Sequence, residues 1–301
     1  MTSLTIFAIQ TQKNQMKKIT LFTLVLLAVT TITNAQTNGT INLAKGQKYV
    51  VENKVTTKST SEMQGQSMES NADITSIYAI EVKDVKDNNY NMTNSISAIK
   101  MNMTTMGQNM SFDSDKKEDM NGEMGSKFKD YINHPTDVVM DKSGNIIVAK
   151  KTDTAKANDE ASQTAMILKQ MGGDPAEQGY GAKMAFMPIP ANAKAGTSWK
   201  DSSSADGIKR VTNYSVKEIK GNTATILISG AENRDTKMEM QGMEINTKTT
   251  GKFSGEQSVD MTTGVVLQNN LSSDASGTIY VMGQEIPTKA TVISVTTVKP
   301  M

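Results

Sequence analysis

Closely spaced methionines are the most distinctive chemical feature of this chain, which contains 22 of them. Met101 and Met103 are separated by one residue, as are Met238 and Met240, and Met243 follows three positions later. Residues i and i+2 of a strand share one face, so two thioethers in this spacing can converge on a soft cation such as Cu(I) or Ag(I). The other interpretation, which we favour, is that methionine fills a buried apolar face. Met238, Met240 and Met243 are kept as the alternative metal site.

The remaining residue types give no pattern for catalysis. His134 is the only histidine and there is no cysteine, which excludes thiol chemistry and leaves too few ligands for a catalytic zinc site. The run Asp141-x-Ser143-x-Asn145 is similar to a calcium loop, but its glycine and acidic positions do not match, and a hairpin turn explains it better. We therefore expect no enzymatic activity and no cofactor.

Trp199 is the only tryptophan, and it follows the proline-containing passage 187–190. A tryptophan at this point could line a ligand pocket, although a buried tryptophan more often fills a core. Trp199 is therefore a candidate ligand contact, with the core interpretation left open beside it.

Four short turns repeat a methionine beside glycine and glutamine, at residues 63–66, 106–108, 240–243 and 282–284. Each lies between threonine-rich stretches of β-forming residues, which is typical of β-hairpins. With Gln241-Gly242 as a two-residue loop, Met240 lies opposite Met243 and Met238 lies opposite Ile245. All four would share one face of the hairpin, so Ile245 joins the candidate apolar face.

The order of elements predicts the fold class. Strands are expected over 46–113 and 197–299, on either side of a helical and hairpin insert, 114–196. Within the insert we expect helices over 115–132 and 154–171, a hairpin over 138–149, and a loop over 172–196. This order indicates an α+β, mainly β protein: one large curved antiparallel sheet, half-barrel-like and made of long hairpins, with the helical insert packed on its concave face. Two separate small sheets are the alternative.

The N-terminal residues predict export. Met16-Lys17-Lys18 precedes an apolar run and a small-residue cleavage site at Ala35, which is typical of a secretory signal peptide over 1–35 with a true start at Met16. Removal of its three lysines changes the formal net charge from +1 to −2, so no nucleic-acid partner is expected. We expect one mature domain, 36–301, that is periplasmic or secreted, has no transmembrane segment, and is not a lipoprotein because it has no cysteine.

Three short motifs carry a resemblance to an uncharacterised family of exported bacterial proteins, a domain of unknown function. They are Leu43-x-x-Gly46-x-x-Tyr49, Val139-x-Asp141-x-x-Gly144-x-Ile146, and Pro188-x-Pro190 followed by Gly196-x-x-Trp199. The expected architecture also resembles, more distantly, the lipoprotein-carrier-like periplasmic half-barrels. That resemblance implies a concave apolar face that holds acyl chains.

These observations lead to a ranked set of hypotheses. The first is a soluble, exported, non-enzymatic protein that binds an apolar ligand, a lipid or an acylated partner, on the concave face of its sheet. The alternatives are a periplasmic Cu(I) or Ag(I) binder and a structural or interaction module of the cell envelope. The candidate ligand contacts are Met101, Met103, Met238, Met240, Met243, Ile245 and Trp199.

Overall fold

The computed structural model of the protein describes residues 39–63, 65–105, 107–149, 179–205, 207–240, 243–281 and 283–301. All of them lie in one compact unit, Gln36–Met301. The predicted signal peptide, 1–35, and the predicted helix 154–171 lie outside the described residues.

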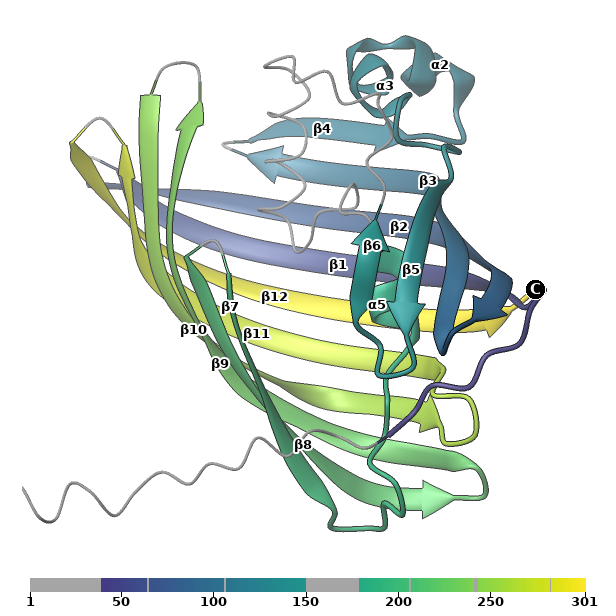
Figure 1. Ribbon diagram of the computed structural model, residues 1–301. Helices are drawn as coiled ribbons and strands as arrows, with labels where there is room; N and C mark the ends of the chain where they lie inside the picture. The colour runs from purple at the N-terminus through teal and green to yellow at the C-terminus, as the bar shows by residue number, and fades with distance from the viewer. Residues whose placement is uncertain are drawn as a thin grey trace, which may run out of the picture. The chain divides into compact units, whose positions relative to one another are not determined.

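One antiparallel sheet of twelve strands makes up most of this unit (Figure 1). The strands before the insert are β1 (Lys48–Met63), β2 (Gln66–Lys86), β3 (Asn89–Thr105) and β4 (Gln108–Asp113). The insert contributes β5 (Thr136–Asp141) and β6 (Ile146–Ala149). The later strands are β7 (Ser198–Ala205), β8 (Ile208–Lys220), β9 (Thr223–Met240), β10 (Met243–Asp260), β11 (Val266–Val281) and β12 (Gln284–Pro300).

The strand order is β6-β5-β3-β2-β1-β12-β11-β10-β9-β8-β7, with β4 also paired to β3. The two predicted strand sets are therefore parts of one sheet, joined where β1 pairs with β12 from Tyr49↔Pro300 to Ser61↔Thr288. This confirms the large antiparallel sheet and shows that the alternative of two small sheets is wrong.

Five two-residue loops with glycine in the second position define one end of the sheet, the turn end. They lie between Met63 and Gln66, Thr105 and Gln108, Ala205 and Ile208, Met240 and Met243, and Val281 and Gln284. The described glycines of these loops have φ between +77° and +78°, a backbone region that glycine enters without a steric cost. The predicted pairing of Met240 with Met243 and of Met238 with Ile245 is confirmed.

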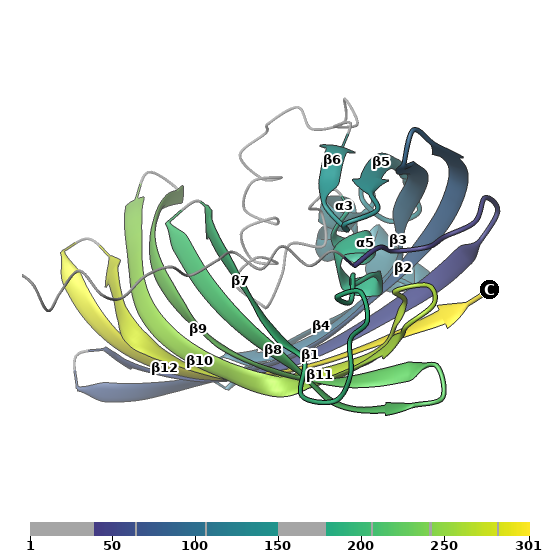
Figure 2. The same cartoon turned by 60° about the horizontal axis from the view of Figure 1, so that its bottom comes forward.

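The sheet curves into a trough, and α5 (Tyr180–Ala185) lies inside it (Figure 2). One register shift lies in the insert, between Val139 and Met140. Four more bend the long strands, between Ile77 and Tyr78, Val82 and Asp84, Val216 and Glu218, and Ser258 and Val259. A β-bulge bends its strand and increases the local twist. Because all four lie in the half of the sheet opposite the turn end, they help to wrap that half around the insert.

The insert covers part of the concave face and one edge of the sheet. α5 contacts β1, β2, β3 and β11, in a passage that we expected to be a loop. The predicted helix 115–132 is instead two short helices, α2 (Lys117–Asn121) and α3 (Glu123–Phe128), which are separated by extended backbone at Gly122. These two helices lie between β4 and β5 along β3. Here the backbone N–H of Ser114 donates to the carbonyl oxygen of Ile99, and that of Asn133 donates to the carbonyl oxygen of Ile96.

The hydrophobic core fills the half of the trough that α5 covers. Tyr78, Val51, Ile80 and Val82 are at most 1% exposed, and the Phe186 ring, just after α5, meets Tyr49 edge-on with the centroids 5.4 Å apart. One row of polar side chains crosses this concave face in register over β2, β1, β12, β11 and β10. The members of this polar row are Ser76, Asn53, Thr296, Asn269 and Gln257.

Candidate ligand-binding face

The concave face continues beyond the core towards the turn end. On β12, for example, Ala290 and Val292 are half-buried, while the intervening Thr291 and Ile293 face the other side and are exposed. A row of mostly short or apolar side chains, which we call the floor row, crosses the sheet here in register. It consists of Met103, Ala72, Thr57, Val292 and Ser273. Short side chains rise less above the strands than the large side chains of the core do, and all five residues of the floor row are half-buried.

Phe253 lies at one end of the floor row, opposite Ser273 on β11 and Gly230 on β9. It is 7% exposed. A Cβ atom at position 230 would lie 2.3 Å from Cζ of Phe253, so only glycine lets the ring lie over β9. This close approach places a large aromatic surface on the concave face, at the boundary of the half-buried floor.

One arginine lies over this ring, and an ion-pair cluster of a glutamate and a second arginine continues from it along β9. Arg210 on β8 lies directly opposite Glu232 on β9, with Nη1 3.5 Å from Oε2. Nη2 of Arg234 lies 3.0 Å from Oε1 of the same glutamate. The Arg210 guanidinium carbon lies 4.1 Å from the Phe253 ring centroid, a cation–π contact. One carboxylate thus faces two guanidinium groups on a partly covered surface.

Trp199 and Tyr214 form an aromatic pair nearer the edge of the sheet. They are cross-strand neighbours on β7 and β8, and their rings stack with centroids 5.2 Å apart and planes 15° apart. Burial, reinforced by the charge of Asp201, raises the pKa of the Tyr214 phenol. Trp199 is 7% exposed and belongs to the core cluster, and its contact with a ligand stays a prediction.

The predicted methionine contacts occupy two distant places. Met101 is 3% exposed, in the core between Ile74 and Phe112 on the neighbouring strands, whereas Met103 is half-buried in the floor row. The backbone pairs Met238 with Ile245 on β9 and β10. β3 and β9 are six strand spacings apart, about 29 Å along the sheet. The structure therefore does not bring the two methionine groups together.

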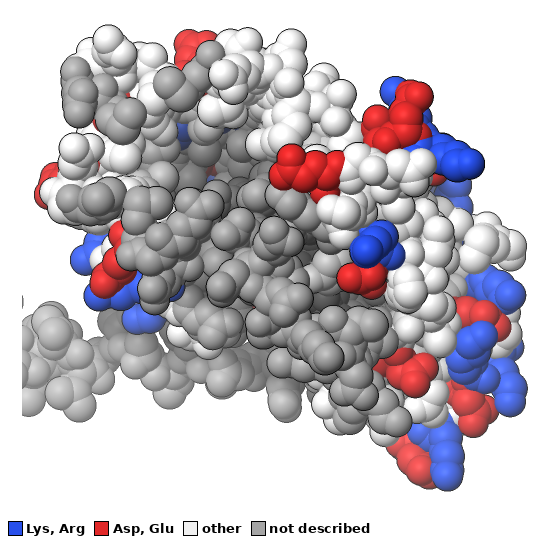
Figure 3. Space-filling model, turned by 90° about the horizontal axis from the view of Figure 1, so that it is seen from above, with Lys and Arg blue, Asp and Glu red and all other residues white. Residues whose placement is uncertain are grey.

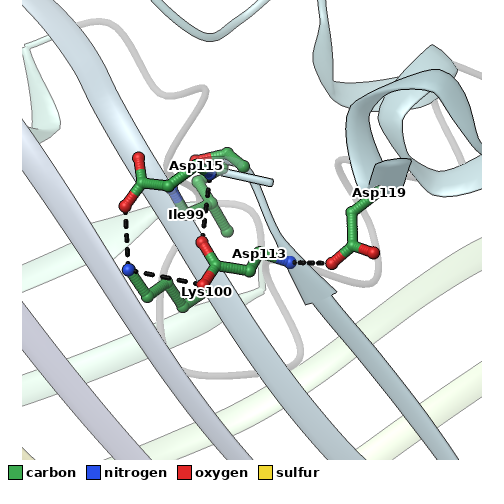
Figure 4. Close-up of polar contacts among 6 residues, drawn as sticks. Ile99, Lys100, Asp113, Asp115 and Asp119 are labelled. Atoms are coloured by element: carbon green, nitrogen blue, oxygen red, sulfur yellow. Dashed lines mark hydrogen bonds and ion pairs between the residues drawn. The ribbon is translucent and has the colours of Figure 1, made fainter. Parts of the chain in front are cut away.

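A charged cluster ties α2 to the outer face of β3 and β4 (Figure 4). Nζ of Lys100 lies 3.4 Å from the Asp113 carboxylate and 2.8 Å from that of Asp115, and Asp119 accepts the backbone N–H of Asp113 at 2.8 Å. The backbone hydrogen bond from Asp115, followed by the interaction with Lys100, lowers the pKa of Asp113. Each of these side chains has a partner within the cluster, so the cluster is a structural link between the helical insert and the sheet.

A groove of about 500 Å³ borders this charged cluster, and its polar lining includes Lys54, Thr56, Asp73 and Asn102. Within it, the hydroxyl of Thr56 donates to Asp73 at 2.6 Å. Acidic and basic side chains alternate along one margin of the molecule in Figure 3. Opposite charges at short range cancel, so neither feature selects a ligand of one sign.

Two further observations bear on the nature of the site. Among the described residues, no group of three or more histidine, cysteine, aspartate or glutamate side chains is placed to hold a metal ion. In the same part of the chain, no helix is long and apolar enough to cross a membrane.

Sequence reasoning missed Arg210, Glu232, Arg234 and Phe253. A tight turn at Gly221-Asn222 predicts the pairing of β8 with β9, but extending that register without the bulge sets Arg210 opposite Asn233. The bulge between Val216 and Glu218 shifts the register by one residue and brings Arg210 opposite Glu232. The signal that could have found the cluster was the alternation of charges at Arg210, Glu232 and Arg234 on two strands joined by a short turn.

The described residues form an open, curved antiparallel sheet, and their hydrophobic core lies in one half of its trough. Residues 87–266 match the model of a family of unknown function (DUF6263), and the chain belongs to this family. No curated protein matches the chain.

Among solved structures, the chain is similar to lipovitellin, from a structure concerned with lipid–protein interactions in that protein. The identity is 9% and the TM-score 0.49, over 86% of this chain and 25% of the lipovitellin chain. It is also similar to the COG4313 outer membrane channel of Pseudomonas putida F1, with 7% identity and a TM-score of 0.24, over 87% and 98% of the two chains. This chain thus spans a quarter of the length of lipovitellin, and likenesses at these scores give no argument about function.

Proposed function

We propose that this protein is an exported, non-enzymatic binding protein that holds an apolar ligand with an acyl chain on the concave face of its sheet. One observation carries the proposal: the concave face extends from the filled core as the half-buried floor row. When a ligand covers apolar surface in this position and removes it from water, the burial favours binding by about 25 cal/mol per Å². The flexible side chain of Met103 at one end of the row suits contacts with ligands of varied shape.

The proposal is tested by the binding of methyl cis-parinarate, a neutral fluorescent lipid probe, to the full chain. We expect saturable fluorescence enhancement with the wild-type protein. Val292→Glu places a carboxylate in the floor row, and the cost of covering a charge with an acyl chain should weaken binding at least tenfold, about 1.4 kcal/mol.

Ile293→Glu is the matched control, because Ile293 is the next residue of the same strand, faces the other side, and is 49% exposed. Binding should be retained in this variant. The proposal fails if wild-type protein does not bind the probe at all, or if both glutamate variants lose binding to the same extent while circular dichroism shows that they are folded.

A further inference from the structure

The arginines beside the floor row indicate the head group of the ligand. We propose that the ligand is an anionic amphiphile, whose carboxylate or phosphate is bound by Arg210 and Arg234 while its acyl chain lies on the floor row. This inference rests on the proposed function and goes further by naming the chemistry of the polar end.

The first argument is the charge of the cluster. Arg210, Glu232 and Arg234 carry two positive charges and one negative charge, and their ion pairs use both carboxylate oxygens of Glu232. Each guanidinium has five N–H donors, so donors remain for a second anion. The next acid on this side, Asp201 on the edge strand, accepts the backbone N–H of Ser202 at 2.7 Å and is in no ion pair with another described residue.

The second argument is the orientation and burial of the two side chains. Arg210 rests on Phe253 and is held by Glu232, so its position is fixed before a ligand arrives. The exposed fractions of the Arg210, Arg234 and Glu232 side chains are 40%, 33% and 26%. A charge-assisted hydrogen bond is stronger when the charged group is partly buried than when it is fully exposed. Enough of each arginine side chain remains accessible to bind a ligand. Glu232 is thus a positioning residue.

The third argument is the continuity of the charged and apolar parts. Phe253 touches Arg210 and lies next to Ser273 at one end of the floor row. From there the row runs through Val292, Thr57 and Ala72 to Met103. This path covers five strand spacings from β10 to β3, about 24 Å along the sheet. A path of this length suits an extended long-chain acyl group. A single amphiphile can therefore reach the arginines with its head while its chain lies on the floor.

The test is the displacement of methyl cis-parinarate by three competitors with the same alkyl chain length: lauric acid, dodecyl phosphate and dodecanol. In the wild-type protein an anionic competitor should displace the probe at a concentration about tenfold lower than dodecanol, about 1.4 kcal/mol. A preference for dodecyl phosphate would identify a phospholipid-type head, and a preference for lauric acid a free fatty acid.

Arg210→Gln and Arg234→Gln should abolish this preference without changing displacement by dodecanol, while Arg234→Lys, which keeps the charge, should retain a preference. Lys209→Gln is the matched control, since Lys209 is the exposed neighbour of Arg210 on the other face, and it should behave as the wild type. Equal displacement by all three competitors in the wild type would overturn the inference and leave the proposed function intact. An equally large effect of Lys209→Gln would also overturn it. Failure of the probe itself to bind would instead refute the proposed function.

Discussion

Replacement of Asn53 by alanine should destabilise the sheet through the polar row. Oδ1 of Asn53 accepts hydrogen bonds from Ser294 Oγ and Thr296 Oγ1, both at 3.1 Å. Asn53 is 6% exposed and Thr296 is 2% exposed. Asn53→Ala removes both bonds and leaves the Thr296 hydroxyl without its acceptor in a place that water does not reach.

The expected loss of stability follows from the two donors. A buried hydroxyl left unsatisfied costs about 1–3 kcal/mol, and an ordinary hydrogen bond contributes about 0.5–1.5 kcal/mol. Because Ser294 is only half-buried, it belongs at the lower end of this range. We therefore expect Asn53→Ala to lower the free energy of unfolding by about 2–3 kcal/mol.

Asn269 supplies the matched control, because it lies in the same row, two strands away. Its Oδ1 is buried and has no hydrogen-bond partner among the described residues, so truncation gives up no bond at this atom. Asn269→Ala should stay within about 1 kcal/mol of the wild type. Urea denaturation followed by tryptophan fluorescence and circular dichroism measures both variants. Equal destabilisation of the two, or a neutral Asn53→Ala, would refute the hydrogen-bond reasoning.

Two further predictions concern a turn and the methionine hairpin. Asp260 accepts hydrogen bonds from Thr262, Thr263 and Asn222; burial alone would raise the pKa of its carboxyl group, but these bonds lower it below 3.8. The contribution of this carboxylate to stability is therefore present above its unfolded pKa and is lost as the pH falls through its lowered folded pKa, below about pH 4. Asp260→Ala should lower the free energy of unfolding by about 1–3 kcal/mol at pH 7 and by less at pH 3. A loss of stability that does not change with pH would contradict this. The register sets Met240 opposite Met243. If these two residues bind a soft cation, the double variant Met240→Leu, Met243→Leu should no longer take up Ag(I) in a calorimetric titration. Unchanged uptake would exclude this hairpin as a metal site.

Local features of the sequence predicted the hairpins but not how they join. The register of Met240 with Met243 follows from a glycine turn and from alternation over a few residues. The pairing of β1 with β12 joins residues at opposite ends of the described chain, Tyr49 with Pro300. No turn sets this register; it depends on which strand edges remain free after the hairpins form, and that is a property of the whole sheet.

The helices show the reverse error, in which local spacing was given too much weight. The periodic apolar residues from Met120 to Ile132 predicted one helix, but Gly122 adopts extended backbone and divides it. Glycine lowers helix stability by about 1 kcal/mol relative to alanine, and short segments have little cooperative gain to offset this cost. α5, in contrast, is a single turn and a half whose Ala182 and Ala185 are fully buried against the sheet, so tertiary packing and not its own sequence accounts for it.

The pairing of β1 with β12 also sets an order of assembly. The hairpins β1–β2, β9–β10 and β11–β12 connect residues close in sequence, so each can form early and by itself. The first and last strand sets can join only after residues 288–300 have become available, because those residues pair with β1. Until then β1 presents a free strand edge along most of its length, which is a template for pairing with another chain. The C-terminal strand thus acts as the closing element of folding, and the time before it docks is when the molecule is most exposed to misassembly.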